Sequence, residues 1–285
     1  MSEVGTLWIV ATPIGTLEDL GLRARQLLVE VDMILAEDTR RAHKLLSALD
    51  LKFRGTMRSL YDQNEASRLR LVISSLEHGL DVALLSDAGT PVLSDPGFQV
   101  VRRAREAGLP VRSVPGPSAF TAALAASAQP PLPATLVGFL PPRRGRRRKK
   151  LGELRLAPGS LVVFLSPHRI DAELEDLIEV LGATRPASLI AEISKRHERC
   201  EVGTLGTLRS SREASGPRGE YVLVVGPDTN ESSAVSETSR DAVGAAYERA
   251  YAECGDRRQA YKLVAARLGM SKREVYSMLI EKQGE

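Results

Sequence analysis

The sequence predicts an α/β protein with two α/β domains followed by a small helical domain. Short apolar runs alternate with segments of helical periodicity over most of the 285 residues, as expected of repeated βα units. A basic block near position 145 interrupts this alternation, and a polar stretch after position 227 ends it. We therefore expect α/β domains at 1–137 and 138–227, a linker at 228–239 and a helical domain at 240–285.

The first half of the chain predicts a largely parallel sheet with helices on both faces. Its apolar runs end in turn signals, and the segments between them repeat apolar residues at helical spacing. The expected strands are 7–11, 31–36, 82–85 and 111–114, and the expected helices are about 18–30, 64–78, 97–107 and 119–128. Because helices follow strands along the chain, neighbouring strands are expected to run parallel.

The alternation resumes in the second half. Strands are expected at 161–165, 187–193 and 220–225, with a helix at about 169–181. Residues 228–239 are polar and lack periodicity, which predicts a linker, and a helical segment follows at about 240–282.

Seven basic residues crowd into positions 143–150, with one glycine among them. They are Arg143, Arg144, Arg146, Arg147, Arg148, Lys149 and Lys150. Two prolines precede the block, so we expect it to lie in a loop. Two interpretations remain open: a mobile solvated loop held open by its own repulsion, or a contact with the phosphates of a polyanion.

The composition predicts a soluble protein of a reducing compartment. The formal net charge is +3 and 43% of the residues are hydrophobic, and no run reaches the roughly 18 apolar residues of a membrane span. Cys200 and Cys254 are too few and too isolated for a disulfide framework or a zinc site. No basic segment precedes a hydrophobic one at the N-terminus. We expect a cytoplasmic protein without a metal and without membrane contact.

Two acidic turns follow the strand expected at 82–85. They are Ser86–Pro91 and Ser94–Gly97, and the ends of strands in α/β proteins are where ligands bind. The chain has neither a Walker loop nor a Gly-x-Gly-x-x-Gly fingerprint after its first strand, which argues against nucleotide hydrolysis and conventional dinucleotide binding. The Ser, Asp, Thr and backbone amide groups of these turns suit a zwitterionic or nucleoside ligand.

An ordered set of motifs extends from the first expected strand to the last. In order, they are Thr12–Gly15, Ala36–Arg40, Ser86–Pro91, Ser94–Gly97, Pro115–Ala119, Gly138–Pro141, Ser166–Arg169 and Gly219–Val222. With these motifs the chain resembles the tetrapyrrole methylase superfamily, and within it a branch that methylates ribosomal RNA. The resemblance implies a homodimer that binds S-adenosyl-L-methionine in a cleft between the two α/β domains of each subunit. It also implies methyl transfer to the 2′-hydroxyl of a cytidine ribose in the decoding region of small-subunit (16S) rRNA.

The resemblance further implies which residues bind the cofactor. By their positions in the motifs, these are Pro13, Ser86, Asp87, Ala88, Gly89, Thr90, Pro91, Ser94, Gly116, Ser118, Ala119, Phe139, Leu140 and Ala191. Three positions depart from the family pattern: Thr16 replaces an Asn, Ala191 an Arg and Ser194 a Thr. Any role of the family's arginine therefore does not carry over.

Methylation of a ribose hydroxyl requires a group that accepts or shares its proton, because the neutral hydroxyl is a poor nucleophile. The candidates are Glu37, Asp38, Asp87 and Lys195, and the sequence does not choose among them. The acids at 37 and 38 equally suit a helix start. Asp95, which directly precedes Pro96, is expected mainly to stabilise its turn or a helix start.

The expected RNA contacts are basic residues outside the cofactor loops. They are Arg40, Arg143, Arg144, Arg146, Arg147, Arg148, Lys149, Lys150, Lys272 and Arg273. In the tail, Ala265, Gly269 and Val275 have the spacing of a helix-turn-helix, although a plain helical hairpin fits as well. A basic helical surface can bind structured RNA through its phosphates.

The sequence alone leaves two other functions open. Methylation of a tetrapyrrole shares the expected fold but leaves the basic block and the basic tail unexplained. A non-enzymatic nucleic-acid-binding regulator explains the tail but not the loop-rich α/β body.

Overall fold

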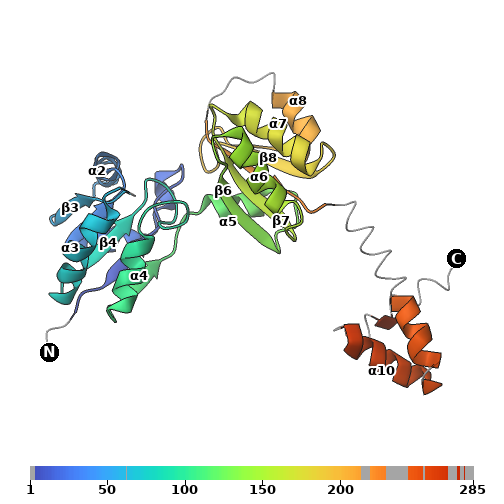
Figure 1. Cartoon of the computed structure of the whole chain (residues 1–285). Helices are drawn as coiled ribbons and strands as arrows, with labels where there is room; N and C mark the ends of the chain where they lie inside the picture. The colour runs from blue at the N-terminus through green and yellow to red at the C-terminus, as the bar shows by residue number, and fades with distance from the viewer. Residues whose placement is uncertain are drawn as a thin grey trace. The chain divides into compact units, whose positions relative to one another are not determined.

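The computed structural model describes residues 4–61, 63–212, 219–228, 243–252, 254–268, 275, 276 and 279. The chain divides into two compact units, Met1–Gly226 and Pro227–Glu285. The larger unit contains two five-stranded sheets (Figure 1). Within the described residues, none of the helices combines the length and apolarity that a membrane span requires.

The first sheet is parallel throughout and has the strand order β3-β2-β4-β1-β5. Its strands are β1 (Leu7–Val10), β2 (Met33–Ala36), β3 (Thr56–Ser59), β4 (Val82–Leu85) and β5 (Val111–Val114). Every residue of β2 and β4 is buried, because both strands are central and are covered on both faces. The parallel sheet expected from the sequence is confirmed; β3, with its alternating exposed and half-buried residues, was missed.

Helices cover both faces of this sheet. After a short 3₁₀ turn at Leu17–Asp19, the helices are α1 (Leu22–Glu30), α2 (Thr39–Ala48), α3 (Glu65–Glu77) and α4 (Phe98–Glu106). Ile34 packs with residues of α1 and α2, whereas its neighbour Leu35 packs with residues of α3 and α4. This division follows from the alternation of side chains along a strand.

The second sheet is mixed and has the order β6-β7-β10-β8-β9. Its strands are β6 (Ala134–Phe139), β7 (Ser160–Leu165), β8 (Pro186–Ala191), β9 (Arg199–Thr204) and β10 (Tyr221–Val225). β6 and β7 are parallel, whereas the pairs β7–β10, β10–β8 and β8–β9 are antiparallel. β9 follows β8 without an intervening helix, so the expected βα alternation does not hold there. Leucines of α7 (Ile170–Leu181) and α8 (Leu205–Arg212) pack on one face of this sheet.

One helix of the N-terminal half packs against the second sheet. α5 (Ala119–Ala126) follows β5 in the chain, but its Ala123 and Leu124 lie in one cluster with Val222 and Val224 of β10. Ile14, from the loop after β1, belongs to the same cluster. The domain boundary expected between residues 137 and 138 falls inside β6, because Gly138 lies at a bulge within the strand rather than at its start.

The smaller unit has helical residues at 243–252 and α10 at Arg257–Leu268. Its buried cluster includes Val243, Ala260, Val264, Ala265 and Val275, two of which are anchors of the expected helix-turn-helix. Other residues of that prediction lie outside the described residues, as does nearly all of the expected linker; these are Gly269, Lys272, Arg273 and residues 229–239.

The basic block is a helix, and the prediction of a loop is wrong. α6 (Arg144–Leu154) has Arg143 as its N-cap residue, directly after the two prolines, and Arg147 and Leu151 are buried one helical turn apart. The two prolines before the block and the mutual repulsion of its basic side chains were the reasons to expect a loop. Acidic residues of α7 pair with Arg144, Arg147 and Arg148, and this tertiary contact is absent from any local pattern.

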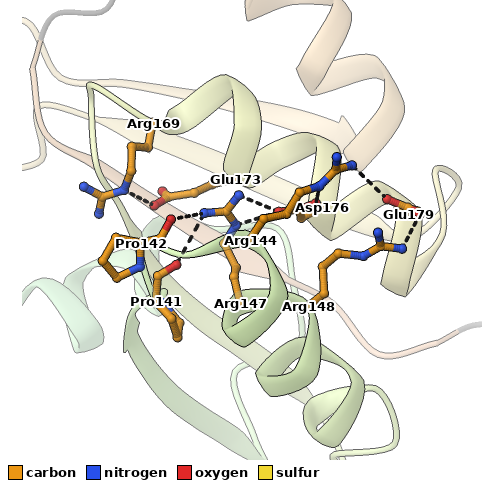
Figure 2. A network of polar contacts seen from close by, with 9 residues as sticks. All are labelled: Pro141, Pro142, Arg144, Arg147, Arg148, Arg169, Glu173, Asp176 and Glu179. Atoms are coloured by element: carbon orange, nitrogen blue, oxygen red, sulfur yellow. Dashed lines mark hydrogen bonds and ion pairs between the residues drawn. The ribbon is translucent and has the colours of Figure 1, made fainter.

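Figure 2 shows the buried centre of this contact. Arg147 donates from Nε to Asp176 over 2.7 Å, and the two side chains are only 4% and 1% exposed. Arg147 Nη1 also donates to the carbonyl oxygens of Pro141 and Pro142, at 3.3 and 3.1 Å. The pair thus connects α7 to the segment that follows β6.

The outer part of the contact between α6 and α7 is exposed to solvent. Arg144 bridges Asp176 at 3.0 Å and Glu179 at 3.4 Å, and Arg148 pairs with Glu179 (Figure 2). Exposed pairs contribute little, whereas loss of one partner of a buried pair leaves an uncompensated charge.

Asp176→Asn should therefore lower the free energy of unfolding by about 3 kcal/mol, because it leaves the Arg147 guanidinium buried without its counter-charge. Urea unfolding measures this loss. Glu179→Gln is the matched control and should cost less than about 1 kcal/mol, since its partners remain hydrated. Equal losses for the two variants would contradict a buried ion pair.

Candidate active site

The carboxyl ends of the parallel strands bring the predicted loops together. The loop after β1 is paired with the loop after β4: Thr12 N donates to Gly89 O at 2.9 Å, and Gly89 N donates to Thr12 O at 3.0 Å. Gly89 has a φ of 82°, a left-handed conformation that favours glycine. The loop after β2 joins them, because Asp38 N donates to Asp87 Oδ1 at 3.2 Å.

A pocket of about 330 Å³ lies beside these loops within the larger unit, a size in the range of small-molecule sites. The first sheet and its loops contribute mostly small and acidic residues: Ile14, Arg41, Asp87, Ala88, Gly89, Thr90, Leu93, Ser94 and Asp95. α5 and the second sheet contribute mainly apolar and aromatic residues: Ser118, Ala119, Phe120, Leu136, Phe139, Phe164, Leu165, Pro167, Ile193, Glu220, Tyr221 and Val222. The pocket therefore has an acidic side and an aromatic side.

Phe139 is the most exposed aromatic residue of the pocket, with 59% of its surface accessible. Its ring packs edge-on against Phe164, with the ring centroids 5.6 Å apart and an interplanar angle of 64°. Phe139 thus contacts a neighbouring ring of its own sheet while more than half of its surface remains accessible. Such a surface can take the planar face of a nucleobase.

On the acidic side, Asp87 has both oxygens engaged. Oδ1 accepts the backbone N–H of Asp38, and Oδ2 pairs with Arg41 Nη1 at 3.1 Å. Asp95 differs: burial raises the pKa of Asp95 to about 6, and the negative charges of Glu37 and Asp87 add to this rise. Two carboxyl groups with different environments share this side of the pocket.

The residues that the family motifs assigned to the cofactor fall into two groups. Asp87, Ala88, Gly89, Thr90, Ser94, Ser118, Ala119 and Phe139 line the pocket. Pro13, Ser86, Pro91, Gly116, Leu140 and Ala191 are not among its lining residues. Leu140, which directly follows β6, and Ala191, the last residue of β8, lie instead in the hydrophobic cluster that packs under α6, α7 and α8. Ser86 is buried, and its hydroxyl donates to Gly89 O at 3.0 Å, which holds the turn.

Several lining residues were not predicted from the sequence. Phe120, Phe164, Ile193 and Tyr221 reach the pocket only because α5 packs against the second sheet. Tyr221 lies in a motif used for the resemblance, so that motif was an available signal. Phe164 carries no local signal, because it reads as one residue of an apolar strand.

The four candidate proton acceptors differ in their surroundings. Asp38 caps α2, and its hydrogen bonds with the Arg40 side chain and backbone hold the pKa of Asp38 well below its usual range. Lys195 bonds Glu192 at 3.2 Å and Glu220 at 3.1 Å; burial lowers the pKa of Lys195, but these two acids outweigh it and raise the pKa overall. Lys195 is therefore protonated at neutral pH and donates rather than accepts.

A close contact joins the loop after β1 to the loop after β8. A Cβ on Gly15 would lie 2.6 Å from the carbonyl oxygen of Ser194. Thr16 Oγ1 donates to that same oxygen at 2.6 Å, and the Ser194 hydroxyl donates to Asp19. Thr16 and Ser194, two of the positions that depart from the family pattern, are therefore partners of one another.

The residues predicted to contact RNA also fall into two groups, those bound to other parts of the fold and those that are exposed. Arg144, Arg147 and Arg148 face α7, and Lys150 Nζ donates to Val137 O at 3.0 Å. The remaining members of the block, which are Arg143, Arg146 and Lys149, are exposed and have no ion pair with another described residue. Arg40 is exposed and pairs with Asp38, whereas Lys272 and Arg273 lie outside the described residues.

Residues 6–209 match the family model described as Tetrapyrrole (Corrin/Porphyrin) Methylases. The chain belongs to this family. A relative from Xylella fastidiosa is 43% identical over 79% of this chain and 82% of its own length. A relative from Mycobacterium tuberculosis is 36% identical over 99% of this chain and 96% of its own. Both relatives are named ribosomal RNA small subunit methyltransferase I, and within the family the chain groups with them.

Solved structures of more distant proteins share the fold. Diphthine synthase superposes with a TM-score of 0.63 at 17% identity, over 79% of this chain and 91% of that chain. Uroporphyrin-III C-methyl transferase from Thermus thermophilus, in a complex with S-adenyl homocysteine, has a TM-score of 0.55 at 21% identity, over 78% and 97% of the two chains. The expected two-domain methylase architecture is confirmed.

Gly15→Ala should weaken binding of S-adenosylhomocysteine and lower the melting temperature, because its Cβ would collide with the backbone of Ser194 and separate the two loops. Calorimetric titration and thermal unfolding measure the two effects. Gly145→Ala on α6 is the matched control: a Cβ there meets nothing within 4 Å, so a helical alanine should leave binding intact and stabilise slightly. Unchanged binding in Gly15→Ala would exclude this contact from the site.

Proposed function

We propose that the protein transfers a methyl group from S-adenosyl-L-methionine to the 2′-hydroxyl of a cytidine ribose in the decoding region of small-subunit rRNA. The observation that carries the proposal is the pocket, which combines an aromatic and an acidic side in a chain 36–43% identical to relatives named for rRNA methylation. The proposed assignments follow from the chemistry of each side.

The residues present fit the proposed cofactor. Bound S-adenosylmethionine supplies a methyl group on a positively charged sulfonium. The uncovered ring of Phe139 suits its adenine, and Asp87 suits its cationic end, because a fixed carboxylate attracts positive charge without rearrangement. Asp87 is fixed by Asp38 N and Arg41, so we assign to it orientation of the cofactor.

The expected proton acceptors then reduce to the carboxylates near the pocket. Arg40 neutralises Asp38, and Lys195 is already protonated. Glu37 lies close enough to raise the pKa of Asp95 by its charge. Asp87 is held by Asp38 N and Arg41, so among the four candidates Glu37 remains compatible with accepting a proton.

RNA is proposed to bind the exposed side of α6 and the basic residues of the smaller unit. Arg143, Arg146 and Lys149 recur every three residues, which places them along one side of the helix. Their charges are not offset by the α7 acids, so they are available to phosphates. The proposed assembly is a cytoplasmic homodimer that acts on rRNA or on the 30S subunit.

Methylation of a tetrapyrrole is the second candidate, because uroporphyrin-III C-methyl transferase shares the fold. The unpaired basic residues of α6 favour RNA, since a macrocycle would not require them.

Purified protein with methyl-labelled cofactor should label small ribosomal subunits and leave extracted tetrapyrrole pigments unlabelled. Mapping should place the label on a cytidine ribose, as resistance of that linkage to alkaline cleavage. Labelled pigment would support the second candidate, and label on a base rather than a ribose would contradict 2′-O transfer.

Replacing Arg143, Arg146 and Lys149 together by alanine should weaken subunit binding and reduce the slope of log affinity against log salt by about 2, since three phosphate contacts are lost. Filter binding over a salt series measures the slope. The matched variant replaces Arg102, Arg103 and Arg105 of α4, which are also exposed and two of which pair with Glu106. Equal slopes for both variants would indicate a general charge effect and not a site on α6.

A further inference from the structure

Asp95 does not cap the helix that follows it. α4 begins after Gly97, which provides no side-chain cap. The free amides at this helix start are bound by Glu65 of α3, whose Oε1 accepts Gln99 N at 2.8 Å and Val100 N at 3.3 Å. Within residues 4–61 and 63–212, Asp95 accepts no hydrogen bond from a backbone amide. The role expected for Asp95 from the sequence is thus filled by another carboxylate.

The backbone around Asp95 is held in an unfavourable conformation. Val92 and Ser94 have φ values of 76° and 74°, which is costly for residues with a Cβ and for Val above all. Gly97 has a φ of 120°, and a Cβ there would lie 2.5 Å from Leu84 Cδ2. A Cβ on Gly138 would lie 2.9 Å from Ser94 Oγ. The loop is therefore pressed between β4 and β6, and strain of this kind is typical of positions that serve a function.

Asp95 lines the pocket among groups that are mostly negative. Glu37 follows β2 and Asp87 follows β4, and the negative charges of both raise the pKa of Asp95. The nearby cations serve other acids: Arg41 pairs with Asp87, and Lys195 pairs with Glu220 across the pocket lining. In the described part of the chain, no Lys or Arg forms an ion pair with Asp95. A carboxylate in such surroundings gains from taking up a proton.

We infer that Asp95 is the group that accepts the proton of the acceptor hydroxyl, an inference that rests on the proposed methyl transfer. The acceptor oxygen bonds to the methyl carbon, and the carbon–sulfur bond breaks with its electron pair on sulfur. The hydroxyl proton passes to the Asp95 carboxylate. A sulfonium and a carboxylate are thereby replaced by a thioether and a carboxylic acid, which later releases its proton to water.

The raised pKa suits this role. A carboxylate whose pKa is about 6 is largely ionised at pH 7 to 8, and it is a stronger base than an exposed aspartate. Asp87, with both oxygens engaged, orients the cofactor, while the Asp95 carboxylate in the same pocket lining forms no ion pair with a described residue. The two acids thus have separate roles.

Single-turnover methylation of small subunits tests the inference, with Glu106→Gln at the exposed end of α4 as the control. Asp95→Asn should slow the chemical step by about 100-fold or more, without changing the affinity for S-adenosylhomocysteine. Asp95→Glu should recover part of the rate. In the wild type, the rate should fall as the pH drops through about 6, and this inflection should vanish in Asp95→Asn.

Thermal unfolding gives a readout that is independent of turnover. Because the folded-state pKa lies above the unfolded one, the wild type loses stability as the pH rises from about 4 to about 6. Asp95→Asn should therefore melt higher than the wild type at pH 8, and the difference should disappear as the pH approaches 4. An aspartate that stabilises its turn in the ionised form would instead melt lower as asparagine at pH 8.

The outcomes separate the two proposals. A wild type that labels no subunit overturns the proposed function. A wild type that labels subunits while Asp95→Asn turns over normally, or binds S-adenosylhomocysteine poorly, overturns the assignment of Asp95 alone. A melting difference that is independent of pH also overturns it.

Discussion

The packing of the loop after β1 and of α5 against the second sheet is the constraint on which the site depends. Ile14 and Leu124 share a buried cluster with Val222 and Val224. Gly15 lies so close to Ser194 that even one added carbon would collide. This contact brings an acidic edge of one sheet beside the aromatic face of another. Neither sheet alone has both the charge and the apolar surface that a nucleoside sulfonium requires.

The buried ion pair between Arg147 and Asp176 supports the segment that follows Phe139 on the aromatic side of the pocket. Besides its ion pair, Arg147 binds the carbonyl oxygens of Pro141 and Pro142, which follow Phe139 by only two and three residues. The position of Phe139 at the end of β6 is thereby coupled to α7. The basic block thus has two roles that the sequence could not separate: one side of α6 supports the fold, and the other remains charged and exposed.

The sequence predicted what local patterns determine. The expected strand 82–85 coincides with β4, because a buried parallel strand is a continuous apolar run between turns. The expected strand 111–114 coincides with β5, although its two middle residues are exposed. It missed what depends on distant partners. α6 is helical because α7 supplies Asp176 and Glu179, and Phe164 reaches the pocket because α5 leaves its own sheet. The motifs correctly indicated the loops that line the pocket. They also assigned Leu140 and Ala191 to the cofactor, but both side chains lie in the hydrophobic core.

Asp95 shows most clearly why a motif does not define a role. An aspartate before Pro96 is the expected turn residue, yet Glu65, distant in sequence, binds the amides that would justify that interpretation. With that role filled, burial and the negative charges of Glu37 and Asp87 act against the ionised form of Asp95. An ionised carboxylate placed where it is disfavoured lowers stability at neutral pH. Such a cost is understandable where a proton must be accepted, because the same unfavourable surroundings make the carboxylate more basic.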